Sequence, residues 1–240
     1  MKMSQNAYLV VDAGNTNIKI CEVFGDEISD FETFNDLDKV LVRVKNLHVV
    51  LISVVNPMVK EKIQKVCKSL FEIKNNVKMP FSSVYESMNT VGVDRLCNVS
   101  GMLKYAKNRS ALSIDIGTCI KFDFLTADAV YKGGSISPGI QLRYRSLNDY
   151  TNNLPLLEQV NHTSLIGNDT KNSIASGVLN GMYSEITGMI SRYEAEYGPL
   201  DIYLTGGDAL YFDIPQKNNI FAIKNLTILG AVEIYKFYAQ

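Results

Sequence analysis

A strand–turn–strand pattern built around an aspartate occurs twice in this chain of 240 residues. The first copy is "VVDAGNTNIKICEV" (residues 10–23) and the second is "SIDIGTCIKFDFL" (residues 113–125). Each has an apolar stretch ending on Asp, then a Gly and a Thr, then a second apolar stretch that carries Ile-Lys. Solenoid repeats recur about every 20–50 residues, so a spacing of roughly 100 residues indicates duplicated domains instead. We therefore predict an α/β chain of two related domains, 1–109 and 110–240, each a mixed sheet flanked by helices.

The spacing of apolar residues predicts the other elements of both domains. In the first domain we expect strands over 8–12, 18–24, 27–34 and 48–55, a helix from Pro57 to Phe71, and a helix from Val93. In the second we expect strand, turn and strand over 111–125, a third strand over 129–137, a helix behind Pro138, and a long helix that ends at Gly198-Pro199. A strand, a glycine turn and the start of a helix follow over 200–210, and a strand and a helix close the chain.

The composition excludes several classes of protein. A formal net charge of -1 argues against binding to nucleic acid or to an anionic membrane surface. The four cysteines are far apart and have no histidine near them, which indicates reduced thiols rather than a zinc site or a disulfide framework. The start of the chain lacks a signal peptide, and the apolar run "VVLISVV" is too short to span a bilayer. We expect a cytoplasmic protein with no membrane partner.

The repeated turn has two interpretations. Asp, Gly and Asn are common turn formers, so "DAGNTN" alone favours an ordinary hairpin. Phosphoryl transfer requires backbone N–H groups and hydroxyls around the phosphates, a carboxylate near the metal ion, and a base for the acceptor hydroxyl. Two Asp-x-Gly-(Asn)-Thr turns at equivalent positions of a duplicated fold would supply the first two requirements. The repetition therefore favours phosphate binding.

A third glycine element, "LTGGDA" (residues 204–209), follows a predicted strand and begins a predicted helix. Its glycines would let a flat ligand approach the backbone, and a helix N-terminus favours negative charge. A plain strand-to-helix turn explains this element equally well. The chain has no G-x-x-x-x-G-K-[ST] motif and no G-x-G-x-x-G behind its first strand, which excludes a P-loop kinase and disfavours a dinucleotide-binding domain.

The three elements in this order resemble the ATPase superfamily of actin, hexokinase and the sugar kinases. In that superfamily two ribonuclease-H-like domains hold ATP in the cleft between them. The more specific resemblance, over nearly the whole chain, is to type III pantothenate kinase. It is carried by "DAGNTN", "GVDR" (92–95), "DIGT" (115–118), "YKGGSISPGIQLRYRSL" (131–147), "NLPL" (153–156) and "GNDT" (167–170).

The resemblance implies a role for each motif. Asp94 would be the catalytic base that accepts the proton of the pantothenate hydroxyl, and Arg95 would bind the substrate carboxylate. For "GVDR" alone, a helix N-terminal Asp beside a surface Arg is the preferred interpretation. Asp12 would position Mg²⁺ through water, and Asp115 would bind a monovalent cation, K⁺ or NH₄⁺. The residues expected to contact ATP are Asp12, Ala13, Gly14, Asn15, Thr16, Asn17, Ile18, Lys19, Thr118, Gly206 and Gly207. Those expected to contact pantothenate are Tyr85, Gly92, Val93, Asp94, Arg95 and Thr170.

The chain departs from the family pattern at a few positions. Glu86-Ser87-Met88 stands where Asn-Pro often follows the equivalent of Tyr85, and Cys119 stands where a small Ala is common. Asp169 lies near the expected site of an anionic substrate, so we expect its side chain to point to solvent. The resemblance also implies a homodimer.

The resulting hypothesis is an ATP-dependent kinase that converts (R)-pantothenate to 4′-phosphopantothenate, the first step of coenzyme A biosynthesis. Two alternatives remain: a non-catalytic relative that serves as an accessory factor in transcription, and another small-molecule kinase of the superfamily. The intact Asp12, Asp94, Arg95 and Asp115 argue against the first alternative. The short "GVDR" and "GNDT" elements argue against the second.

Overall fold

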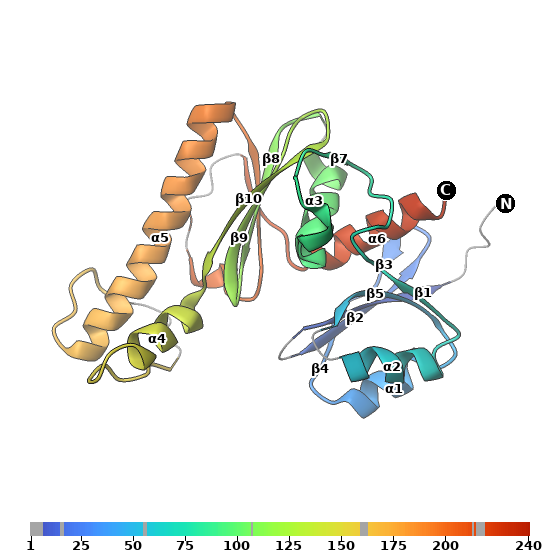
Figure 1. Ribbon diagram of the computed structural model, residues 1–240, viewed down its shortest axis with the longest axis horizontal. Helices are drawn as coiled ribbons and strands as arrows, with labels where there is room; N and C mark the ends of the chain where they lie inside the picture. Colours follow the sequence, from blue (N-terminus) through green and yellow to red (C-terminus); the bar gives the residue numbers. More distant parts are fainter. Residues whose placement is uncertain are drawn as a thin grey trace. The chain divides into compact units, whose positions relative to one another are not determined.

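The structure is a computed structural model that describes residues 7–14, 17–54, 57–106, 108–158, 163–212, 214 and 219–240. Figure 1 shows its helices and strands in the order of the chain. The chain forms two compact units. The first comprises Met1–Tyr105 together with Leu226–Gln240, and the second comprises Ala106–Asn225. Along the described parts of the chain, no helix combines the length and apolarity needed to cross a membrane.

The first unit contains a mixed sheet in the order β3-β2-β1-β5-β6, with β4 also paired to β2. Its strands are β1 (Tyr8–Ala13), β2 (Ile18–Phe24), β3 (Glu27–Ile28), β4 (Glu32–Phe34), β5 (His48–Val54) and β6 (Ser69–Glu72). β1 and β2 are antiparallel, whereas β1, β5 and β6 run parallel. The short strand β7 (Ser82–Ser83) and the 3₁₀ turn η1 (Met88–Thr90) follow β6 in the chain.

Helices cover both faces of this sheet, because successive side chains of a strand point to opposite faces. Leu9 and Val11 of β1 are buried in one cluster with α1 (Leu37–Val44) and α2 (Pro57–Val66). Val10, which lies between them, is buried in a second cluster with α3 (Val93–Ala106) and α6 (Leu226–Tyr238). β1 therefore lies inside the unit, and the turn that follows it is anchored by a rigid strand.

The second unit contains a mixed sheet in the order β12-β11-β8-β9-β10. Its strands are β8 (Ala111–Ile116), β9 (Cys119–Leu125), β10 (Val130–Pro138), β11 (Asp201–Thr205) and β12 (Ile220–Ala222). β8, β9 and β10 form antiparallel pairs, while β11 lies parallel to β8 and to β12. Its helices are α4 (Ile140–Asp149) and α5 (Thr170–Tyr197), with one 3₁₀ turn, η2 (Ala209–Tyr211).

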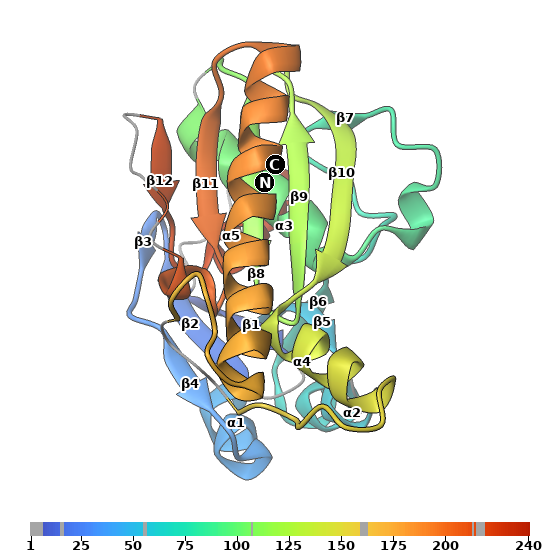
Figure 2. The same ribbon diagram turned by 90° about the vertical axis from the view of Figure 1, so that its left-hand side faces the viewer.

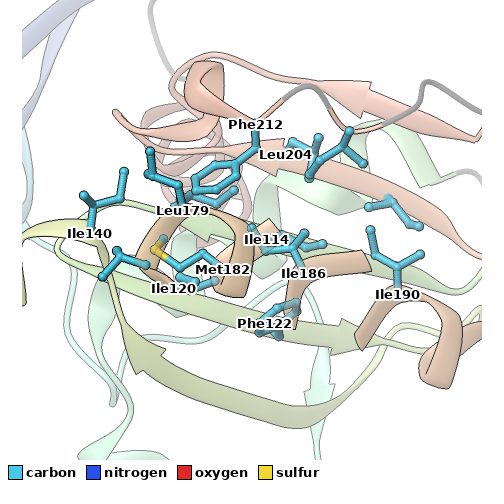
Figure 3. Packing of buried hydrophobic residues seen from close by; sticks show 14 of the residues in the cluster. Ile114, Ile120, Phe122, Ile140, Leu179, Met182, Ile186, Ile190, Leu204 and Phe212 are labelled. Atoms are coloured by element: carbon cyan, nitrogen blue, oxygen red, sulfur yellow. The ribbon is translucent and has the colours of Figure 1, made fainter. Parts of the chain in front are cut away.

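The long helix α5 packs along one face of this second sheet (Figure 2). Its buried side chains recur every three or four residues, which places them on one side of the helix. Figure 3 shows Met182 and Ile186 of α5 against Ile114, Ile120 and Phe122 of β8 and β9. This apolar contact holds α5 in a fixed position on the sheet and makes it a firm support for the segments that bond to it.

Most of the predicted elements are present, but several details differ from prediction. The strand predicted over 27–34 is divided into β3 and β4, and between them the Glu22 backbone N–H donates to the Ser29 side chain instead of to a strand carbonyl. The helix α1 is not among the predicted elements, although Asp36 caps it by accepting a hydrogen bond from the Asp38 backbone N–H. The helix predicted to reach Phe71 ends at Val66, and the following residues form β6. Leu70 and Phe71 pack into different clusters on opposite faces of the sheet, as neighbours in a strand must. After Thr205 the expected helix is only the 3₁₀ turn η2.

The last helix lies in a different unit from the one predicted. The predicted second domain, 110–240, includes residues 226–240, whereas in the structure α6 belongs to the first unit. Ile228 and Val232 of α6 are buried with Val10 and with other residues of that sheet. A Cβ atom on Gly230 would lie 1.6 Å from the carbonyl oxygen of Cys97, so only glycine lets α6 pack this closely on α3. The apolar faces of α3 and β1 therefore determine where α6 packs.

Candidate active site

The two copies of the repeated motif have the same geometry in the two units. In the first, Asp12 lies directly opposite Lys19 in the antiparallel pair β1–β2, and the Gly14 N–H donates to the Asn17 carbonyl at 3.2 Å. In the second, Asp115 lies opposite Lys121 in the pair β8–β9, and the Gly117 N–H donates to the Cys119 carbonyl at 3.1 Å. Each copy thus has a carboxylate at the second-last residue of a strand, a glycine in the turn that follows, and a lysine across from the carboxylate on the next strand.

The second carboxylate is nearly buried and forms an ion pair. Asp115 is 9% exposed, and its Oδ2 lies 2.8 Å from Lys121 Nζ. A buried charge is costly unless it is paired, and Lys121 provides that pairing for Asp115. Sequence reasoning missed this function of Lys121, although the Ile-Lys that both copies share could have indicated it.

The backbone of Gly206 packs closely against Asp115. Gly206 has a φ of +99°, and a Cβ atom there would lie 2.6 Å from Asp115 Oδ1 and 2.2 Å from the Ile116 carbonyl oxygen. Only glycine therefore lets the backbone of this segment approach these two oxygen atoms. Among the described residues, no group of three or more His, Cys, Asp or Glu side chains could hold a metal ion. A cation here would depend on Asp115, on backbone carbonyls and on oxygen atoms of the ligand.

Two other glycine segments hold the second turn in place. The Gly139 N–H donates to the Thr118 carbonyl at 3.0 Å, and the Asp208 N–H donates to the Ile116 carbonyl at 2.9 Å. A Cβ atom on Gly139 would lie 1.9 Å from the Gly117 carbonyl oxygen, so this approach requires glycine. The structure thus brings "DIGT", "SPG" and "LTGGD" together within the second unit. Thr118, Gly206 and Gly207 are exposed there.

In the first unit, the "GVDR" motif begins α3. The Gly92 carbonyl accepts hydrogen bonds from the Arg95 and Leu96 backbone N–H groups at 3.0 and 3.3 Å. Asp94 Oδ1 also accepts from the Arg95 N–H, at 2.9 Å. A carboxylate in the first turn of a helix is favoured by the helix dipole. Asp94 is therefore held by the start of the helix and remains half-exposed.

Arg95 and Tyr85 are ten positions apart in the chain and come together in the structure. The Arg95 guanidinium lies over the Tyr85 ring, 6.0 Å from its centroid. Arg95 is only 4% exposed, so the interpretation of "GVDR" as an Asp beside a surface Arg is wrong on this point. The Tyr85 backbone N–H donates to Ser83 Oγ at 3.0 Å, which positions the ring. The departure at Glu86-Ser87-Met88 therefore does not separate Tyr85 from Arg95.

Asp12 and Asp94 share a neighbour, Cys97 of α3. Burial raises the pKa of the Cys97 thiol well above its ordinary value, and the negative charges of Asp12 and Asp94 raise that pKa further. Both carboxylates therefore lie close enough to one buried thiol to act on it electrostatically. Cys97 itself is fully buried.

Thr170 is the first residue of α5 and lines a cavity of about 710 Å³. Arg143 and Ser146 of α4, and Ser173 and Gly177 of α5, also line this cavity. Asp169 is exposed, as predicted, and it also caps α5 by accepting a hydrogen bond from the Asn172 backbone N–H at 2.8 Å. The cap places Thr170 at the rim of the cavity.

The remaining predicted residues lie in or beside these motifs. Ala13 is buried at the end of β1, Ile18 and Lys19 begin β2, and Val93 begins α3. Asn17 is exposed in the turn between β1 and β2. Asn15 and Thr16 lie outside the described residues.

Comparisons with known proteins identify close relatives over nearly the full length. A family model described as Type III pantothenate kinase matches residues 8–192. A type III pantothenate kinase of Christiangramia forsetii is 34% identical over 238 residues, covering 95% of this chain and 98% of that protein. Another, of Cytophaga hutchinsonii, is 35% identical over 232 residues, covering 95% of this chain and 98% of that protein.

Solved structures share the fold. A protein of Campylobacter jejuni, titled as a Baf family transcriptional activator, aligns with a TM-score of 0.65 at 21% identity, covering 96% of this chain and 98% of that one. A 2-dehydro-3-deoxygalactonokinase structure from Sinorhizobium meliloti aligns with a TM-score of 0.54 at 12% identity, covering 97% of this chain and 98% of that one. The expected α/β, actin-like ATPase fold is confirmed. Since the family model spans most of the chain and the relatives exceed 30% identity, this chain belongs to the type III pantothenate kinase family.

Proposed function

We propose that this chain transfers the γ-phosphoryl group of ATP to the hydroxyl of (R)-pantothenate. The product is 4′-phosphopantothenate, and the reaction is the first step of coenzyme A biosynthesis. The observation that carries this proposal is the similarity, at 34–35% identity over 95% of the chain, to proteins named type III pantothenate kinase. The first unit supports it independently, because Asp94, Arg95 and Tyr85 provide a base, a cation and an aromatic wall for a small organic anion.

Asp94 is the proposed base, since its carboxylate is held at the start of α3 and stays accessible. It orients the acceptor hydroxyl and takes its proton late in a loose, metaphosphate-like transition state. Arg95 would bind the pantothenate carboxylate through its planar fork of donors. Tyr85 limits the freedom of that guanidinium by stacking under it. Gly92, Val93 and Thr170 are the other proposed substrate contacts.

The two glycine turns are the proposed binding site for ATP. Gly14, Asn17 and Lys19 follow Asp12 in the first unit, and Thr118, Gly206 and Gly207 lie together in the second. Asp12 would hold Mg²⁺ through water, while Asp115 would hold a monovalent cation, K⁺ or NH₄⁺. When bound, Mg²⁺ neutralises charge on the phosphate oxygens. Lys121 forms an ion pair with Asp115.

The accessory-factor alternative gains no support from the Campylobacter jejuni protein, because a likeness at 21% identity concerns the fold alone. Against that alternative stand Asp12, Asp94, Arg95 and Asp115, each in a defined position. Another small-molecule kinase is the second alternative, and the Tyr85–Arg95 pair next to Asp94 argues against it. We also propose that the protein is a cytoplasmic homodimer with no nucleic-acid or membrane partner.

The test is ADP release by the purified protein with Mg²⁺ and ATP, measured with and without pantothenate. We expect release to depend on pantothenate and to fall when K⁺ is replaced by Na⁺. Glucose and acetate serve as control acceptors for the other kinases of the superfamily. Absence of pantothenate-dependent release in K⁺ buffer would reject the proposed function, and release with glucose alone would support the second alternative.

A further inference from the structure

Arg143 of α4 connects three elements of the second unit. Its Nε donates to the Pro138 carbonyl at 2.8 Å, and its Nη2 forms an ion pair with Glu185 Oε2 on α5. Glu185 Oε1 in turn accepts a hydrogen bond from Ser137 Oγ at the end of β10. Figure 2 shows α4 beside the N-terminal half of α5. The end of β10 is therefore tied to α5 by two side chains, Arg143 and Glu185.

This network reaches Pro138, and the next residue, Gly139, is hydrogen-bonded to the turn of residues 117–119, called here the second phosphate turn. Pro138 pairs with Cys119 in the register of β9 and β10, and Gly139 follows it directly. The Gly139 N–H donates to the Thr118 carbonyl at 3.0 Å. Because a peptide unit is planar and trans, the direction of the Thr118 carbonyl also determines the direction of the Cys119 N–H. A shift of Pro138 would thus rotate the backbone of the turn proposed to bind ATP.

The Arg143–Glu185 ion pair is partly shielded from water and is attached to a well-packed helix. Glu185 lies on α5 next to Ile186, which is buried against the sheet. The Arg143 and Glu185 side chains are 23% and 27% exposed, so water screens the ion pair less than it would at the surface. An arginine is needed because its rigid fork reaches a carbonyl and a carboxylate at once, whereas a lysine offers a single charged nitrogen.

We propose that Arg143 and Glu185 are positioning residues for phosphoryl transfer. They fix Ser137-Pro138-Gly139 against α5, and through the Gly139–Thr118 hydrogen bond they set the backbone of the second phosphate turn. Neither residue contacts that turn directly. The proposal rests on the proposed role of Thr118 in binding ATP.

The test compares Arg143→Met and Glu185→Gln with a matched control, Arg43→Met. Arg43 on α1 forms ion pairs with Glu22 and Glu32 in the other unit, and its side chain is 26% exposed. Calorimetry with Mg-ATP, without pantothenate, gives nucleotide affinity. Steady-state kinetics gives kcat and the KM of each substrate separately, and circular dichroism gives the melting temperature.

We expect Arg143→Met to weaken Mg-ATP binding by about tenfold or more, the range produced by small displacements of positioning groups. The KM for pantothenate should stay within about twofold, because the substrate residues of the first unit are untouched. Glu185→Gln keeps an acceptor for Ser137 and should be less impaired, and Arg143→Lys should remain impaired. Arg43→Met should lose a similar amount of thermal stability with unchanged Mg-ATP affinity.

Three results would overturn the proposal. The first is wild-type Mg-ATP affinity in Arg143→Met. The second is an equal loss of affinity in Arg43→Met, which would mean a general effect of instability. The third is a rise in the pantothenate KM alone, which would make Arg143 a substrate contact in the cavity that it lines with Thr170.

If Arg143→Met does not fold, Glu185→Gln and Arg143→Lys carry the same comparison. If the wild-type protein did not turn over pantothenate, the proposed function would be rejected. The comparison of Mg-ATP affinities would still decide whether Arg143 and Glu185 position the second phosphate turn.

Discussion

At the scale of single residues, the environment of each carboxylate decides what it can do. Asp94 accepts a backbone hydrogen bond at the start of α3 and keeps an exposed side, so it is held without being enclosed. Asp115 is nearly buried and forms an ion pair with Lys121, which offsets the cost of burying its charge. Asp208 is half-buried. The same type of side chain thus occurs in three different environments.

Asp94→Asn should lower kcat by about 10²–10⁴-fold, the usual contribution of a general base. Mg-ATP affinity should be unchanged, because the amide keeps the size of the side chain and an oxygen for the Arg95 N–H. Asp38→Asn is the control, since Asp38 also lies in the first turn of a helix, α1, away from the candidate site. Retained turnover in Asp94→Asn would place the base elsewhere.

Asp208 offers a test by pH. Burial raises the pKa of Asp208 above its ordinary value of 3.8, so the folded protein binds this proton more tightly than the unfolded chain does. The free energy of unfolding therefore falls as the pH rises from that ordinary value through the raised pKa. Asp208→Asn removes this loss, so its melting temperature should exceed the wild-type value at pH 8, by a margin that narrows towards pH 4.

Asp128 provides the opposite case. A hydrogen bond from Thr126 lowers the pKa of Asp128 below its ordinary value of 3.8. The ionised carboxylate therefore raises the free energy of unfolding at pH values above 3.8, and this contribution is lost as the pH falls through the lowered pKa. Asp128→Asn should therefore melt below wild type at pH 8, and the difference should disappear in acid. If the difference in melting temperature between Asp208→Asn and wild type did not change with pH, the raised pKa assigned to Asp208 would be contradicted.

At the scale of elements, the ends of helices and strands position the candidate groups. Asp169 caps α5 with one carboxylate oxygen on the Asn172 backbone and the other on the Asn172 side chain, both at 2.8 Å. Thr170 follows immediately and faces the cavity. Gly139 caps α4 and holds the second phosphate turn. In both places the residue that begins a helix also organises the site.

Asp169→Ala should reduce the free energy of unfolding by about 1 kcal/mol, as the loss of an N-cap does. Because fraying of the first turn moves Thr170, the KM for pantothenate should rise while Mg-ATP affinity stays constant. Asp36→Ala is the matched control, since Asp36 caps α1 in the same way. It should cost similar stability, measured by urea unfolding, with no change in either kinetic constant. Equal kinetic effects in the two variants would exclude a special role for the α5 cap.

At the scale of the whole molecule, the chain leaves the first unit, completes the second, and returns. The last helix, α6, closes the core of the first unit, where Cys21 and Cys97 are buried. Burial raises the pKa of the Cys21 thiol to about 12 and that of Cys97 well above its ordinary value. Only the thiolate reacts with alkylating reagents, so both thiols should be inert in the intact protein.

Removal of residues 226–240 should therefore unfold the core of the first unit and expose its buried cysteines, while the second unit stays folded. We expect iodoacetamide at pH 8 to label Cys21 and Cys97 in the truncated chain at nearly the rate measured in urea. Both should stay unlabelled in the full chain, as mass spectrometry of peptides can establish. Cys119, in the second unit, serves as the internal control and should label equally in both. Protection of Cys21 and Cys97 after truncation would mean that the first unit folds without α6.

Sequence alone determined the elements whose signals are local. Stretches of apolar residues predict β1, β2, β8 and β9, helical spacing predicts α5, and the repeated Asp-x-Gly turn predicts where the carboxylates lie. Such signals depend on residues a few positions apart, which the sequence displays directly. The family motifs likewise indicate the candidate residues and the expected chemistry.

The three-dimensional structure was needed to show which distant segments meet. Ile228 packs with Val10, Arg95 lies buried over Tyr85, and Arg143 reaches Glu185 across two helices. Contacts of this kind depend on which apolar faces bury each other best and on the geometry of loop closure, and neither leaves a periodic mark in the sequence. The sequence thus determined which groups are available for catalysis, whereas packing decided which of them are held together and by what.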